Sequence, residues 1–423
     1  MSPAPNSGPS KSVFARIVGA EELSPRENGN GLRIMLAVAM SKIGDGLIDP
    51  KLVLSWLLTA LGAPAYFIGA LVPIREAGAL LPQLLLASSL GRMRQRKWMW
   101  VAGSALQGVA ALAIAFSGLV LSGWIAGLAI CVALAVLAVA RSACSVSFKE
   151  VLGKSVSRTH RGSVTGFAGS VASAAVVVFA LWLIFGVQTS EIVVVGAVAG
   201  AGLLWLLAAL IFAGLSEKDS RRYSSNGSEF RRLLHEDWYL RRFILVRGLL
   251  VSTALAPPYL VLLSAPKGGA VLEHLGALVL ASALASLLSS YLWGRLSDWS
   301  SRRVLFLSGI IGGLAMASMV VVARVGLVGQ AVWLSPLVLF VLMIAYHGVR
   351  QARSTYLVDL APRDFRGAYT AIVNTLIGTI LLVAGLFGGV LSYAGPEAAL
   401  VGFAVMSLLG AGLALTLREV EKR

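Results

Sequence analysis

The sequence predicts an all-α polytopic membrane protein, and composition, hydropathy and the spacing of apolar runs carry that prediction. Of 423 residues, 57% are hydrophobic and only 13% are charged, and the mean hydropathy is +0.82. Soluble domains keep about a quarter of their residues charged. Apolar runs of about 20 residues, each long enough for a helix to cross ~30 Å of hydrocarbon, recur along the whole chain.

Polar and Gly/Pro-rich joints divide the chain into about twelve apolar segments. The expected membrane spans are 34–60, 65–90, 98–118, 121–141, 163–187, 191–215, 243–264, 270–292, 303–323, 330–349, 368–392 and 397–417. They group into two halves of six spans. The expected organisation is a disordered tail (1–33), a helical bundle (34–215), a linker (216–242), a second bundle (243–417) and a short tail (418–423).

The linker is a long polar stretch that joins the two halves. Its first part has the composition of a flexible segment. Its second part carries Phe230, Leu233, Leu234 and Trp238 among arginines, which is typical of a helix that lies on an anionic membrane surface.

The formal net charge of +16 fits either a nucleic-acid partner or loop charge that fixes orientation in a membrane. The basic residues gather in alternate loops, which favours the second interpretation and gives no reason to expect a nucleic-acid partner. They are Arg92, Arg94, Arg96, Lys97, Lys149, Lys154, Arg158, Arg161, Arg295, Arg302, Arg303, Arg350, Arg353, Arg363 and Arg366. The positive-inside rule then places both termini and the linker on the cytoplasmic side of the cytoplasmic (inner or plasma) membrane.

Two loop motifs recur in the second half at nearly one offset. Gly91 in GRMRQRKW is repeated 203 residues later by Gly294 in GRLSDWSSRR, and Arg161-Gly162 is repeated 205 residues later by Arg366-Gly367. A displacement by six spans preserves orientation, so the halves are expected to be related by a pseudo-two-fold axis along the membrane normal.

These loops give the sequence a resemblance to the major facilitator superfamily of secondary transporters. The family signature is Gly-x-Leu-x-Asp-x-x-Gly-Arg-Arg, after the second helix and again after the eighth. The second copy fits at Gly294, Leu296, Asp298, Arg302 and Arg303, with Ser301 in place of a glycine. The first copy is degraded, because Gly91 and Met93 fit but Gln95 replaces the acidic residue.

The resemblance implies alternating access, with the loop residues acting as a cytoplasmic latch between the halves. The latch residues would be Gly91, Arg161, Gly294, Asp298, Arg302, Arg303 and Arg366. An alternative is that these arginines only fix the topology. In the family, the first, fourth, seventh and tenth helices line the path, which makes Tyr259, Tyr346 and His347 candidates for solute contact.

Six charged residues interrupt the first two apolar spans, namely Lys42, Asp45, Asp49, Lys51, Arg75 and Glu76. At ~1.5 Å per residue, Asp49 lies about 22 Å and Glu76 about 21 Å from the cytoplasmic ends of their spans. Lys51 and Arg75 share that level, and a helix break is expected at Gly44-Asp45-Gly46 and at Pro50. The spans of the second half hold almost no charge by comparison.

Two interpretations of these charges remain open. Pairing that joins the two helices would explain them, because an unpaired charge in the membrane costs ~2.5–3.5 kcal/mol on insertion scales. Alternatively, a carboxylate exchanges a proton during transport, with Asp49 and Glu76 the first candidates and Asp45 the third. Arg75 and Lys51 would then hold these carboxylates or meet an anionic solute.

The predicted function is proton-coupled transport of a small organic solute by a monomer in the lipid bilayer. A non-transporting assembly factor with the same fold and a proton-independent facilitator are the alternatives. The sequence shows no nucleophile cluster for a membrane enzyme and no cysteine or histidine cluster for a metal, so we expect no catalysis, metal or cofactor. Paired charges in the first half would suit an anionic or zwitterionic solute, while the apolar second half would suit an amphipathic solute that is exported.

Overall fold

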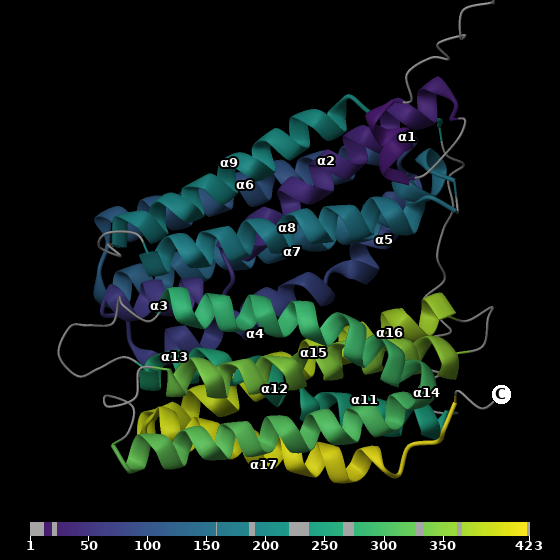
Figure 1. Ribbon diagram of the computed structural model, residues 1–423. Helices are drawn as coiled ribbons and strands as arrows, with labels where there is room; N and C mark the ends of the chain where they lie inside the picture. The colour runs from purple at the N-terminus through teal and green to yellow at the C-terminus, as the bar shows by residue number, and fades with distance from the viewer. Residues whose placement is uncertain are drawn as a thin grey trace, which may run out of the picture.

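A computed structural model of the chain describes residues 12–18, 23–157, 159–185, 191–219, 237–264, 275–326, 333–361 and 366–420. All the regular secondary structure of these residues is helical, as predicted. The expected interfacial helix of the linker lies outside the described residues, apart from Trp238, which begins the next helix. Two layers of nearly parallel helices make up the molecule (Figure 1).

The first layer consists of the helices up to residue 213. They are α1 (Val13–Val18), α2 (Pro25–Leu47), α3 (Val53–Ala60), α4 (Ala65–Leu80), α5 (Gln83–Arg92), α6 (Lys97–Val120), α7 (Gly123–Ser155), α8 (Arg161–Phe185) and α9 (Glu191–Ala213). The second layer consists of α11 (Trp238–Leu250), α12 (Ser252–Leu255), α13 (Pro257–Ser264), α14 (Leu275–Arg324), α15 (Leu334–Leu360), α16 (Arg366–Leu391), the 3-10 turn η3 (Ser392–Ala394) and α17 (Pro396–Ala414).

Several membrane spans are built from more than one helix, and prolines explain most of the interruptions. The first span stops at Leu47 and resumes at Val53, around Pro50, whereas the expected break at Gly44-Asp45-Gly46 does not occur. Pro82 separates α4 from α5. Conversely, α14 is two helices joined at Ser300, whose φ of −163° and ψ of 100° are extended.

Nine helical stretches among the described residues are long and apolar enough to cross a membrane. The broken pairs α2–α3 and α4–α5, together with the first part of α14, complete the pattern of about twelve spans that the sequence predicts. The protein is therefore an all-α integral membrane protein.

The two layers meet along two helix pairs, α4 with α16 and α8 with α14, and α3 contacts α13 at one end. That end lies opposite the one that carries α1 and the end of α17 (Figure 1). Glycines permit the close approach. A Cβ on Gly69 of α4 would overlap the hydroxyl of Tyr259, and one on Gly385 of α16 would overlap Pro73. We call the two layers the first and second bundles below.

Candidate functional site

A cavity of about 260 Å³ lies between the bundles. Its first wall is charged and comes from α2 and the break after it. Its second wall comes from α8, α14 and α15 and is largely apolar or hydroxylic. The residues on this second wall are Ala172, Ser173, Val176, Val279, Ser282, Ala283, Ser286, Met343, Tyr346, His347 and Arg350. Both bundles therefore contribute to one solvent-accessible space.

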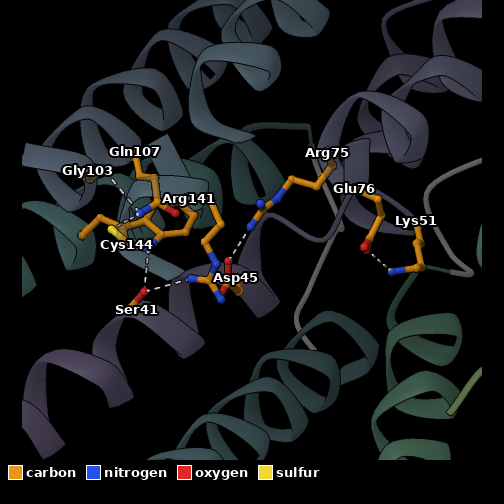
Figure 2. Close-up of polar contacts among 10 residues, drawn as sticks. Ser41, Asp45, Lys51, Arg75, Glu76, Gly103, Gln107, Arg141 and Cys144 are labelled. Carbon is orange, nitrogen blue, oxygen red and sulfur yellow. Dashed lines mark hydrogen bonds and ion pairs between the residues drawn. The ribbon is translucent and has the colours of Figure 1, made fainter. Parts of the chain in front are cut away.

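Asp45 is the centre of an ion network that joins three helices of the first bundle (Figure 2). Arg75 of α4 approaches its Oδ1 at 2.7 Å, and Arg141 of α7 approaches its Oδ2 at 2.5 Å. Arg141 also donates to Ser41 Oγ at 3.2 Å. Both oxygens of the carboxylate thus accept charge-assisted hydrogen bonds from guanidinium groups, which are stronger than hydrogen bonds between neutral groups.

Lys51 and Glu76 form a second and looser ion pair, with Nζ and Oε1 3.6 Å apart (Figure 2). The Lys51 side chain is 7% exposed and the Glu76 side chain 31%. Lys51 Nζ also lies 4.7 Å from the centroid of the Tyr346 ring, across the interface on α15. The pair is therefore in direct contact with the second bundle.

Asp49 lines the cavity but bonds mainly to the backbone. Its Oδ1 accepts the amide hydrogens of Lys51 at 2.7 Å and of Leu52 at 3.2 Å. These bonds satisfy donors that the helix break would otherwise leave unpaired, because Pro50 interrupts the helix just before α3. Lys42, one turn of helix before Asp45, donates to the carbonyl of Thr165 on α8 at 3.1 Å.

Three arginines of the second bundle also face this region, and the expectation that its spans are almost free of charge is wrong. Arg350 is exposed and lines the main cavity, and a smaller cavity of about 20 Å³ brings Glu76 and Tyr346 together with Arg247, Arg350 and Arg353. The sequence places Arg350 and Arg353 in a loop after residue 349. The helix instead continues to Leu360, because a hydropathy window ends at a charged residue whether or not the helix does.

Arg141 was missed for the same reason. The predicted span ended at 141, whereas α7 runs from Gly123 to Ser155 and places Arg141 in mid-helix. The sequence does contain a signal for this extension, since no proline or glycine occurs between residues 141 and 152 to end the helix.

The aromatic candidates occupy different environments. Tyr346 and His347 line the cavity, with ring centroids 5.1 Å apart, and His347 Nε2 is buried with no hydrogen-bond partner. Tyr259 is only 1% exposed and packs edge-to-face on Phe403 at 5.6 Å. The structure places Tyr259 at the contact between the bundles and outside the cavity lining.

The loop residues make their described contacts within one bundle. Arg161 donates to the carbonyls of Val156 and Gly153 at the end of α7, and Arg302 pairs with Glu419 at 2.8 Å, with Arg303 at 3.9 Å from the same carboxylate. Gly91 lies near the end of α5. The side chains of Asp298 and Arg366, and the surroundings of Gly294, lie outside the described residues.

Comparison with known proteins identifies related sequences and folds. The sequence model of the Major Facilitator Superfamily matches residues 253–423. A mutant structure of the nucleoside transporter NupG gives a TM-score of 0.72 at 13% identity, covering 92% of this chain and 100% of that one. The structure of a D-xylose-proton symporter gives 0.67 at 12% identity, covering 93% and 98%. A search of curated protein sequences gives no match.

Proposed function

We propose that this chain, a major facilitator superfamily protein by its fold and by the sequence of its residues 253–423, is a secondary active transporter of a small organic solute. The observation that carries the proposal is the position of the ion network. Asp45, Lys51 and Glu76 lie within membrane-spanning segments. Asp45 and Lys51 border the larger cavity and Glu76 borders the smaller one, and both bundles contribute to each cavity. Intramembrane charges are costly and mark solute or proton pathways.

The contact of Lys51 with both Glu76 and Tyr346 links the network to the position of the second bundle. Alternating access requires the bundles to move relative to each other around a central site. Such a movement would separate Lys51 from the Tyr346 ring and change the water around Glu76. A change at the cavity would thereby alter the surroundings of a carboxylate, which is what coupling to protons needs.

Among the three carboxylates, Glu76 is best suited to exchange a proton. Asp45 is engaged by two arginines, so protonating it would leave both without a partner. Asp49 is engaged by two backbone amides. Glu76 forms one ion pair, which is longer than those of Asp45, and its side chain is more exposed than that of Asp45. This exposure gives Glu76 a route to water.

The test is flux in sealed proteoliposomes, with and without an imposed pH gradient, using a panel of uridine, D-xylose and benzoate. We expect at least one member to accumulate when the gradient is present. Glu76→Gln should abolish accumulation driven by the gradient and keep equilibrative flux, because the neutral amide cannot carry the proton. Asp49→Asn is tested in parallel.

The matched control is Glu191→Gln, which neutralises an exposed carboxylate at the start of α9. This control should behave as the unmodified protein does. Flux that is the same with and without the gradient would indicate a proton-independent facilitator. No flux for any solute would favour a non-transporting assembly factor, and unchanged gradient dependence in both cavity variants would eliminate Glu76 and Asp49 as proton carriers.

A further inference from the structure

The carboxylates around the cavity are all occupied by partners in the protein itself. Asp45 pairs with Arg75 and Arg141, Glu76 pairs with Lys51, and Asp49 accepts from the backbone. Among the described residues of the two cavities and their ion network, these three carboxylates stand against seven cations. The formal excess is therefore four positive charges.

The cations that make up this excess form no ion pair with a carboxylate among the described residues. They are Lys42, Arg247, Arg350 and Arg353. Arg247 is only 5% exposed and its Nε has no hydrogen-bond partner. The Arg247 head group reaches only Asn374, at a long 3.5 Å. A buried cation such as Arg247 is costly without a counter-charge, and Glu76 is the carboxylate that lines the smaller cavity together with Arg247, Arg350 and Arg353.

We propose that the solute is an organic anion with an apolar body, whose negative group sits between Lys51 and Arg350. This inference rests on the proposed transport function and specifies its solute. A carboxylate or phosphate in this position would supply the counter-charge that the described residues around the cavities lack. Guanidinium groups bind such oxyanions through paired, charge-assisted hydrogen bonds.

The lining of the cavity matches the two parts of such a solute. Lys51 on the first wall and Arg350 on the second supply positive charge, while Val176, Val279 and Met343 of the second wall offer an apolar surface. A volume of about 260 Å³ lies just below the usual range for drug-sized ligands and suits a molecule of roughly ten heavy atoms. Small inorganic anions would leave the apolar wall unused.

The proposed anion would also bridge the bundles, since Lys51 belongs to the first and Arg350 to the second. Glu76 would compete with the anion for Lys51 and the arginines. Neutralising Glu76 is therefore expected to tighten anion binding, whereas it is expected to abolish gradient-driven accumulation. These opposite effects of one substitution separate binding from coupling.

The experiment is thermal unfolding of the purified full-length protein at constant ionic strength with matched probes. Benzoate and phenyl phosphate are compared with benzamide and benzylammonium, which keep the ring but remove or reverse the charge, and with sulfate, which lacks the ring. We expect Tm to rise with benzoate, phenyl phosphate or both and not with benzamide or benzylammonium. Binding to the folded state raises Tm. Sulfate cannot contact the apolar surface, so it should raise Tm less than the better organic anion does.

Variants locate the binding site. Arg350→Gln and Lys51→Gln should each weaken binding of the anion that raises Tm at least tenfold, and Glu76→Gln should tighten its binding. Arg94→Gln is the matched control, because Arg94 is 70% exposed and pairs with Asp219 far from the cavity. The unliganded Tm of each variant shows whether it is folded.

The proposal is overturned if neither organic anion raises Tm, if neutral or cationic probes do so equally, or if Arg350→Gln and Lys51→Gln bind the anion as the control does. Flux distinguishes this failure from failure of the proposed function. Transport of uridine or D-xylose without anion binding would refute the anionic solute and keep the transporter. Anion binding without flux of any probe would keep the anion site and refute the transport function.

Discussion

Asp45 shows how much of the charge network depends on one side chain. Sequence spacing indicated that acids and bases of the first two spans lie at similar depths, but not that an arginine of a third helix completes the arrangement. Pairing in space depends on which helices are neighbours, and a single span contains no information about that. The sequence therefore predicted the participants of the first two helices and could not predict that Arg141 pairs with Asp45.

Replacing Asp45 tests this network. Asp45→Asn would leave Arg75 and Arg141 without this carboxylate partner. Breaking a fully buried ion pair from one side costs ~3–5 kcal/mol, and because these pairs are partly buried the loss should be smaller. We expect a clear fall in Tm of the purified protein. The double variant Asp45→Asn with Arg141→Gln should lose less than the sum of the single losses. Additive losses would mean that the two side chains do not interact.

The ends of the helices were the feature of secondary structure that the sequence predicted least well. Apolar runs predicted where helices cross the membrane, and Pro50 predicted the break between α2 and α3. The same runs ended too early at Arg141 and at Arg350, because hydropathy reports a lipid-like environment and these helix faces line a cavity or a polar interface. Hydropathy assigns only apolar residues to membrane helices, so it leaves out charged residues that lie inside a bundle.

The close packing of α4 against α13 and α16 can be tested by a glycine substitution. Gly69→Ala places a methyl group against the Tyr259 hydroxyl, which also lies 3.0 Å from a Cβ built on Gly388. Overpacking of this kind costs ~1–3 kcal/mol, so Tm should fall. Tyr259→Phe in the same chain removes the closest clashing atom, the hydroxyl oxygen, but keeps Cζ at 2.8 Å, so it should restore part of the loss.

Gly200→Ala on α9 is the control for this substitution. A Cβ there meets nothing within 4 Å, so alanine should be neutral or slightly stabilising, since alanine is the better helix former. Equal effects of the two glycine substitutions would show that the bundles do not approach closely at Gly69.

For the whole molecule, composition and the apolar runs predicted the class of fold. The repeated loops predicted two related halves, and the basic residues in alternate loops predicted the orientation in the membrane. The sequence did not predict how the bundles face each other. That arrangement depends on shape complementarity between residues far apart in the chain, such as Pro73 against Gly385. No periodic pattern in the sequence indicates such complementarity.

The distribution of charge between the bundles has a kinetic consequence. Among the described residues, all three carboxylates around the two cavities belong to the first bundle, and the arginines of α11 and α15 add only positive charge from the second. When the bundles close around an unfilled centre, like charges lose water together without compensation. The unloaded carrier should therefore turn over slowly. We expect labelled benzoate to leave vesicles severalfold faster when unlabelled benzoate bathes the outside, and equal efflux rates would show that the return step carries no such electrostatic barrier.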